Sequence, residues 1–220
     1  MSLPEIKARI DAACKDAGRA PASVSLVAVS KGQAPDRITD MLDQGQRLFG
    51  ENRVQEAEKR WPDLRATYPG VVVHLIGHLQ TNKAKEAVQL FDTIQSVDSI
   101  KLAGALKTEM EKQKRDLPCF IQVNTGDEEQ KGGVAIKDLP ALFRFCTEAQ
   151  LRVEGLMCIP PLHEIPDMHF ALLHKLGKEL GVKQLSMGMS ADFETAIRYG
   201  ATHVRVGTAL FGIRENAKAV

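Results

Sequence analysis

The sequence predicts an α/β protein built as a single closed (β/α)8 barrel of the TIM-barrel class, preceded by one extra helix. Eight short runs rich in β-branched residues alternate with helical patterns along the whole chain. Most of these runs are too apolar to have one face in water, which is typical of a parallel sheet covered by helices. The chain has 220 residues, a little below the roughly 250 that this barrel usually takes, so residues 1–220 are expected to form one domain.

The eight expected strands are short and follow one another at similar intervals. In chain order they are Ser25–Ser30, Leu48–Asn52, Val71–Gly77, Thr93–Val97, Cys119–Asn124, Val153–Ile159, Gln184–Gly188 and His203–Thr208. Between them, apolar residues recur at the spacing of a helix face, for example at Val54, Ala57, Trp61 and Leu64. This alternation of strand and helix is the pattern of a repeated β–α unit.

An additional helix is expected before the first strand, with its apolar face at Ile6, Ile10, Ala13 and Ala17. Ser99 and Ser190 are expected to cap two later helices. A doubly wound open sheet is the alternative fold. Its usual signatures are missing, because no GxGxxG follows the first strand and no GxxxxGK occurs in the chain.

The composition excludes several classes of protein. The chain has 29 Lys plus Arg and 28 Asp plus Glu, so it lacks the basic surplus of a dedicated nucleic-acid binder. No apolar run approaches the roughly 20 residues of a membrane span, and the first residues do not resemble a secretory signal. The cysteines form no CxxC pair and the histidines show no metal-ligand spacing. We therefore expect a cytoplasmic protein with reduced thiols that binds no metal, nucleic acid or membrane.

Lys31 is the first candidate for a functional residue. Barrel enzymes place their chemistry at the carboxyl ends of the strands, and Lys31 directly follows the first strand. Loss of hydration at the mouth of an apolar barrel lowers the pKa of a lysine, which favours its attack on a carbonyl to form a Schiff base. The alternative is a lysine that extends from the strand end into solvent.

The ends of the seventh and eighth strands predict an anion site. Ser190 and Thr208 follow glycine-containing strand ends, at Gly188 and Gly207, and each is expected to precede a helix. Glycine allows close approach of the backbone, hydroxyl groups donate hydrogen bonds, and these two loops are where phosphate most often binds in this fold. The alternative is two ordinary strand–helix turns. Asp192 would repel a phosphate unless it points away.

Arg205 lies inside the last expected strand. If it faces the barrel interior, its charge needs an anionic or acceptor partner. Alternation equally allows it to face outward, beneath a helix. An aldehyde-reactive lysine together with a phosphate site fits pyridoxal 5′-phosphate (PLP), and it also fits a phosphorylated sugar.

Five segments resemble the pyridoxal phosphate homeostasis protein family. They are AVSK at 28–31, FGENRVQEA at 49–57, HLIGHLQTNK at 74–83, LSMGMSADFETAI at 185–197 and VRVGTALFG at 204–212. Together they extend over nearly the whole chain in register. The resemblance implies a barrel like the N-terminal domain of alanine racemase, which binds PLP through an internal aldimine.

The resemblance also implies roles for individual residues. Lys31 would carry the aldimine, and Ser190, Gly207 and Thr208 would hold the phosphate. Arg205 would lie near the ring or the phosphate, Asn52 would line the site, and Met157 and Met189 would pack around the ring. The chain departs from the family pattern at two places. Gly32 stands where Thr is expected and should loosen the loop, and Lys131-Gly132-Gly133 stands where Lys-Ser-Gly is usual.

The lack of a second acid–base group favours a carrier over an enzyme. Racemisation needs a proton donor and acceptor on opposite faces of the cofactor, and neither Tyr68 nor Tyr199 is expected at the barrel mouth. We expect a monomeric protein that carries and regulates PLP and delivers it to PLP-dependent apo-enzymes. Two alternatives remain: a PLP-dependent amino-acid racemase that uses His78 or water, and a class I aldolase-like enzyme that uses Lys31 on a sugar phosphate.

Overall fold

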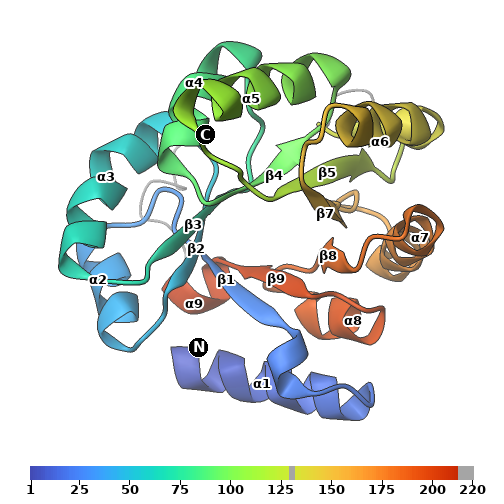
Figure 1. Ribbon diagram of the computed structural model, residues 1–220. Coiled ribbons are helices and arrows are strands. Elements are labelled where there is room, and N and C mark those ends of the chain that lie inside the picture. Colours follow the sequence, from blue (N-terminus) through green and yellow to red (C-terminus); the bar gives the residue numbers. More distant parts are fainter. Residues whose placement is uncertain (129–131, 213–220) are drawn as a thin grey trace.

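The computed structural model describes residues 1–128 and 132–212, and it confirms the closed barrel. Parallel strands form the wall: β1 (Ser25–Val29), β2 (Leu48–Glu51), β3 (Val72–Leu75), β4 (Thr93–Val97), β5 (Cys119–Asn124), β7 (Val153–Met157), β8 (Gln184–Ser186) and β9 (His203–Val206). Each pairs with the next in this order, and β9 pairs with β1, which closes the ring (Figure 1). The two-residue strand β6 (Val134–Ala135), which the sequence did not predict, pairs with β5.

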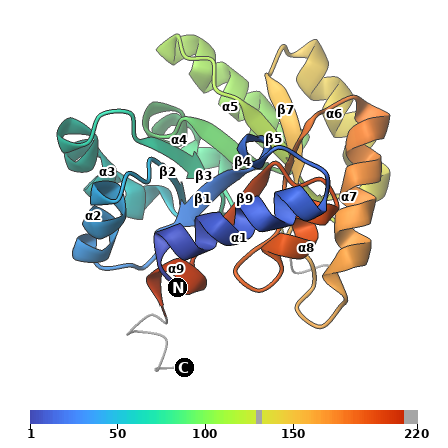
Figure 2. The ribbon, with the colours of Figure 1, turned by 90° about the horizontal axis from the view of Figure 1, so that it is seen from below.

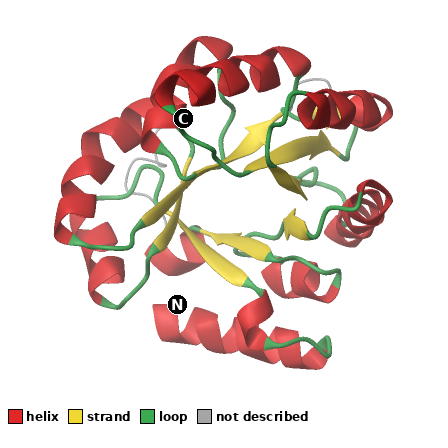
Figure 3. Ribbon diagram, viewed as in Figure 1, coloured by secondary structure: helices red, strands yellow, loops and turns green. Residues whose placement is uncertain are grey.

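Helices surround the barrel on all sides (Figure 3). They are α2 (Pro35–Asp43), α3 (Val54–Thr67), α4 (Ala84–Leu90), α5 (Ile100–Gln113), α6 (Leu139–Glu148), α7 (Pro166–Leu180), α8 (Phe193–Arg198) and α9 (Thr208–Phe211), with short 3₁₀ helices η1 (Pro21–Ser23), η2 (Thr81–Lys83) and η3 (Ile136–Asp138). Each longer helix presents an apolar face to the strands. In α3, for example, the buried Trp61 packs against Phe49 of β2 with ring centroids 4.9 Å apart. As expected, the Ser99 side chain caps α5.

The extra N-terminal helix, α1 (Leu3–Asp16), takes part in this outer layer. Its N-terminus carries a capping box, in which Ser2 and Glu5 exchange hydrogen bonds between side chain and backbone. Its apolar face, which includes Leu3, Ile6 and Ile10, is buried. The helix lies outside β1 and β9, on the side of the barrel where α9 has only four residues, and packs beside α8 (Figure 2). The additional helix thus completes the covering of the barrel.

Most apolar side chains lie between the strands and the helices, whereas the interior of the barrel is partly polar. Gln95 of β4 and Ser186 of β8 are completely buried and share a hydrogen bond of 2.6 Å. Since β4 and β8 are not neighbours in the ring, this bond must cross the interior. Hydrogen-bonded polar side chains therefore fill part of the barrel interior and join strands on its opposite sides.

Several strands end a few residues before their predicted limits because the chain turns into the loops of the mouth. The seventh strand is an example: β8 ends at Ser186, and Gly188 then adopts φ +90°. A side chain at Gly188 would lie 2.5 Å from Ala196 Cβ, so this turn requires glycine. The turn brings the residues after β8 against α8.

Among the described helices, none combines the length and the apolar character needed to cross a membrane. The four cysteines are buried and form no disulfide. Burial raises the pKa of the Cys146 thiol to about 11 and that of Cys158 to about 12, so neither offers a reactive thiolate near neutral pH.

Candidate functional site

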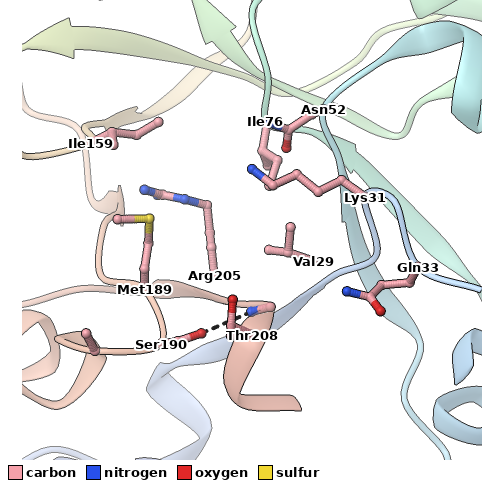
Figure 4. A pocket seen from close by; sticks show the side chains of 12 residues that line it. Val29, Lys31, Gln33, Asn52, Ile76, Ile159, Met189, Ser190, Arg205 and Thr208 are labelled. Carbon is pink, nitrogen blue, oxygen red and sulfur yellow. Dashed lines mark hydrogen bonds between the residues drawn. The ribbon is translucent and has the colours of Figure 1, made fainter. Parts of the chain in front are cut away.

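A cavity of about 270 Å³ opens at the carboxyl ends of the strands. Its walls come from loops far apart in the sequence (Figure 4). The lining residues are Val29, Lys31, Gln33, Asn52, Ile76, Ile159, Met189, Ser190, Ala191, Arg205, Gly207 and Thr208. All of the predicted site residues except Met157 are therefore brought together in one place.

Lys31 is carried by a tight turn at the end of β1. The N–H of Gln33 donates to the Ser30 carbonyl at 3.1 Å, which closes the turn around Lys31 and Gly32. Gly32 has φ +64°, a conformation that glycine adopts without strain. The residue that was expected to loosen this loop thus lies in a hydrogen-bonded turn. The Lys31 side chain extends from the turn into the cavity (Figure 4).

Ser190 joins the two loops that were predicted to bind an anion. The prediction that it caps a helix is wrong, because α8 begins only at Phe193. Its hydroxyl oxygen instead accepts hydrogen bonds from the backbone N–H groups of Gly207, at 3.3 Å, and Ala209, at 3.2 Å. A hydroxyl oxygen accepts two hydrogen bonds and donates one. With both acceptor positions used, the remaining hydrogen-bonding capacity of the Ser190 hydroxyl is that of a donor.

Asp192 does not line the cavity, although its charge acts on the buried Arg205. Its carboxylate accepts the backbone N–H of Met189 at 2.6 Å, and it is absent from the cavity lining. Thr208, which lies directly after Gly207, adds a second hydroxyl to the same wall. Two hydroxyl groups and the glycine backbone therefore face the cavity together.

Arg205 faces the interior of the barrel, which decides between the two orientations that the sequence left open. It is 4% exposed, and its guanidinium donates to the Ser186 hydroxyl at 2.7 Å and to the Cys158 carbonyl at 2.8 Å. Burial lowers the pKa of this guanidinium, but arginine stays protonated at any physiological pH. Both of these acceptors are uncharged, and the Asp192 carboxylate, which acts on Arg205 through its charge, does not line the cavity, so Arg205 brings a positive charge to the cavity wall.

A chain of buried hydrogen bonds supports Arg205 from below. Ser186 donates to the amide oxygen of Gln95 at 2.6 Å, and the amide nitrogen of Gln95 lies 2.8 Å from Nδ1 of His74. Burial lowers the pKa of His74 to about 3, so its ring is neutral and Nδ1 can accept from Gln95. The orientation of Arg205 thus depends on a column of neutral polar groups.

The remaining predicted residues differ in their placement. Asn52 lines the cavity, and its Oδ1 atom is buried without a hydrogen-bond partner among the described residues. Met189 lines it as well and is 37% exposed. Met157 is fully buried and is not part of the lining, so it fills the core instead. Lys131 lies outside the described residues.

Sequence reasoning missed five lining residues: Val29, Gln33, Ile76, Ile159 and Ala191. Most are apolar, and their residue types give no signal of a site. Their positions do give a signal. Each of these residues lies at or just beyond the end of a strand, and either that strand or the neighbouring strand also supplies a predicted site residue. Val29, Ile76 and Ile159 give the cavity apolar walls, which are typical of small-molecule sites.

Acid–base groups other than Lys31 and Arg205 are missing from the part of the cavity wall that the structure describes. The lining includes no Tyr, His, Asp or Glu. Tyr68 donates from its hydroxyl to Asp43 at 2.7 Å, away from the mouth. His78 is exposed and lies 3.4 Å from the Asp98 carboxylate. Neither occupies the position of a proton donor opposite Lys31.

Comparison with known proteins agrees with this geometry. A family model described as the alanine racemase N-terminal domain matches residues 2–215. The pyridoxal phosphate homeostasis protein of Aquifex aeolicus is 40% identical, over 97% of this chain and 97% of its own. The structure of PipY from Synechococcus elongatus without PLP superposes with a TM-score of 0.84 at 38% identity, covering 94% of this chain and 100% of PipY.

PipY has also been solved with PLP bound, with a TM-score of 0.82 at 36% identity, covering 93% of this chain and 100% of that one. Alanine racemase from Bartonella henselae shares the fold at 18% identity, with a TM-score of 0.73 over 100% of this chain and 61% of the racemase. The family model and the homeostasis proteins both match nearly the full length of the chain. The chain therefore belongs to the pyridoxal phosphate homeostasis protein family.

Proposed function

We propose that the protein binds PLP in this cavity, holds it covalently on Lys31, and carries and regulates the cofactor rather than using it for efficient catalysis. One observation carries the proposal: a single cavity collects an amine, a guanidinium and two hydroxyl groups, with no carboxylate on its described walls. Such walls favour an anionic ligand that also reacts with an amine. The names of the relatives and the PLP-bound structure of PipY support the choice of PLP.

Ser190 and Thr208 would hold the phosphate, with Gly207 allowing close approach of the backbone while its N–H binds the Ser190 hydroxyl. The hydrogen of Ser190 would be donated to the ligand, because its oxygen already accepts two N–H groups. Hydrogen bonds to a charged acceptor are stronger than those between neutral groups. The nearby charge of Arg205, which has only uncharged acceptors, further favours a dianionic group in the cavity.

The ring would occupy the apolar part of the cavity. Val29, Ile76 and Ile159 offer apolar walls, and Met189 adds a polarisable thioether, a group that contacts aromatic rings favourably. The buried Oδ1 of Asn52 would accept a hydrogen bond from the ligand, which would remove the cost of leaving it without a partner. The residues present thus fit a phosphorylated aromatic aldehyde.

Lys31 would form the covalent link. When bound, PLP supplies an aldehyde that amines attack and a ring that stabilises negative charge next to the resulting carbon–nitrogen double bond. Nζ of Lys31, as the neutral amine, would add to the aldehyde carbon, and the aldehyde oxygen would leave as water with the two amine hydrogens, so no oxidant or reductant would be needed. Amines displace such a link by the same exchange, so it suits storage and delivery.

Proton transfer to an amino-acid substrate would have only one well-placed group. Lys31 could serve one face, but no tyrosine, histidine or carboxylate lines the described walls to serve the other. A positioned acid–base group is typically worth 10² to 10⁴ in rate. We therefore propose that turnover is slow. We also propose that this protein is a cytoplasmic monomer and that PLP-dependent apo-enzymes receive the cofactor from it.

The absorbance spectrum of the purified protein after addition of PLP tests the proposal. After unbound PLP has been removed, a Schiff base on Lys31 leaves a visible band that borohydride abolishes, whereas a class I aldolase-like enzyme retains no such band. Incubation with L- and D-alanine then separates carrier from racemase. We expect no interconversion at an ordinary enzymatic rate, and a rate typical of racemases would contradict the carrier function.

A further inference from the structure

Arg60 of α3 holds the turn that carries Lys31 at both of its ends. Its Nη1 donates to the Ser30 carbonyl and its Nη2 to the Gln33 carbonyl, each at 3.0 Å. These two carbonyls flank Lys31 in the turn that the Gln33 N–H closes. One rigid, planar guanidinium therefore fixes the backbone on either side of the lysine.

Glu51, the last residue of β2, holds Arg60 in turn. Its Oε1 lies 2.7 Å from Nη1 of Arg60 and also accepts from the Ser30 hydroxyl, at 2.8 Å, and from the Trp61 indole, at 3.1 Å. The Glu51 side chain is fully buried and that of Arg60 is 16% exposed. Burial raises the pKa of the carboxyl, and the charge of Arg60 opposes this shift. The pair is thus a buried, interdependent unit behind the cavity.

Neither residue lines the cavity itself. Glu51 points away from it, toward α3, as shown by its bond to Trp61, and the residues that do line the cavity on this side are Lys31, Gln33 and Asn52. The Arg60 guanidinium therefore acts on the site through the backbone of residues 30–33. A substitution there can change the placement of Lys31 without removing any group that touches a ligand.

We propose that Arg60, oriented by Glu51, is a positioning residue that sets the direction in which Lys31 enters the cavity. This inference rests on the proposed function, in which Nζ must reach an aldehyde carbon while the phosphate is held at Ser190 and Thr208. A lysine side chain has many rotamers, and misplacement of a reacting group by about 1 Å can cost on the order of 10²-fold in rate. Anchoring the turn at both ends reduces that freedom at its origin.

The test separates covalent capture from binding. For Arg60→Ala we expect the rate and the extent of Schiff-base formation with PLP to fall about tenfold, as expected for the loss of hydrogen bonds to a charged donor. Binding of 4′-deoxypyridoxine 5′-phosphate, which has the same ring and phosphate but no aldehyde, should change less than about twofold. Arg60→Lys keeps the charge beside Glu51 but cannot bind both carbonyls in the same planar geometry. Its rate and extent of Schiff-base formation should lie between those of the wild type and of Arg60→Ala.

Arg65→Ala is the matched control. Arg65 lies on the same helix, pairs with the Asp92 carboxylate and donates to the Leu90 carbonyl at 2.9 Å, but it contacts neither the turn nor the cavity. The Arg65→Ala variant should have a lower melting temperature than the wild type, as Arg60→Ala should, while Schiff-base formation stays at the wild-type level. Equal losses for the two ligands in Arg60→Ala, or equal losses of Schiff base in the two variants, would show a merely structural role.

The outcome for the wild-type protein keeps the two proposals apart. If the wild type forms no Schiff base, the proposed function itself is wrong. If the wild type forms one and Arg60→Ala forms it equally fast and equally far, only the positioning role of Arg60 is overturned.

Discussion

Arg205 and Ser186 lie on adjacent strands, β9 and β8, and are joined inside the barrel by a hydrogen bond of 2.7 Å. The Ser186 hydroxyl donates a hydrogen bond to the amide oxygen of Gln95, and the amide nitrogen of Gln95 is hydrogen-bonded to His74. The chain of bonds runs from the cavity across the barrel to β3. The direction of the one buried guanidinium at the site is therefore set by side chains from three other strands.

Replacing Arg205 by methionine should separate stability from ligand binding. Burying the Arg205 charge costs desolvation energy, whereas removing Arg205 leaves the Cys158 carbonyl without this donor. Because the two effects oppose each other, Arg205→Met should change the free energy of unfolding of the ligand-free protein by less than about 2 kcal/mol. Loss of the charge should weaken PLP binding at least about tenfold, because a hydrogen bond or charge contact to a charged group is worth ~1.5–3 kcal/mol. Thermal unfolding with and without PLP measures both. A large loss of stability with unchanged affinity would contradict this assignment.

His74 and His203 should make the protein less stable in acid. Burial lowers the pKa of His74 to about 3 and that of His203 to about 4, against an ordinary value of 6.5. At a pH between the lowered pKa of each histidine and 6.5, that histidine binds a proton in the unfolded chain but not in the folded protein. Stability is therefore full above about pH 6.5 and falls as the pH drops toward 4, by about 1.4 kcal/mol per pH unit for each histidine.

Urea unfolding between pH 7 and 5 checks this slope. His74→Gln removes one of the two titrations and should make the dependence of the unfolding free energy on pH shallower. His163→Gln, at an exposed histidine, should leave the slope of the wild type unchanged. A slope that is the same in all three proteins would show that the buried histidines do not govern it.

Ser190→Ala should weaken the binding of PLP more than that of pyridoxal, which has no phosphate. The substitution removes the hydrogen that Ser190 would donate to the ligand, and it also frees the N–H groups of Gly207 and Ala209. We expect a loss of roughly 1.5–3 kcal/mol for PLP, as for one hydrogen bond to a charged group. Titration calorimetry with both ligands measures the difference. Equal losses for PLP and pyridoxal would place the phosphate elsewhere.

The sequence predicted the barrel and most of the site for the same physical reason. In a parallel barrel every strand ends at one mouth, so the residues that follow apolar runs must meet there. Lys31, Ser190 and Thr208 come from strand ends distant in the sequence, yet all three line one cavity. The extra N-terminal helix was evident from its apolar face, although this pattern did not predict its place outside β1 and β9, beside α8.

Other features could not be predicted because they depend on where each strand ends. Met157 and Ile159 are two residues apart at the end of β7, and only Ile159 reaches the cavity. The role of Ser190 depends on how the loops after β8 and β9 meet, which no local pattern encodes. The contact of Arg60 with the turn at Lys31 likewise joins a helix to a preceding loop, and only the packed structure shows it.

Borohydride reduction of the PLP-loaded protein, followed by peptide mapping, tests the central claim most directly. Lys83 provides the comparison, since it also follows a strand near the mouth, in η2, but pairs with Glu86 at 3.0 Å and does not line the cavity. The account predicts one reduced adduct, on Lys31, which disappears in a folded Lys31→Ala variant and persists in Lys83→Ala. An adduct on Lys83 or another lysine, or an adduct that survives in Lys31→Ala, would contradict it.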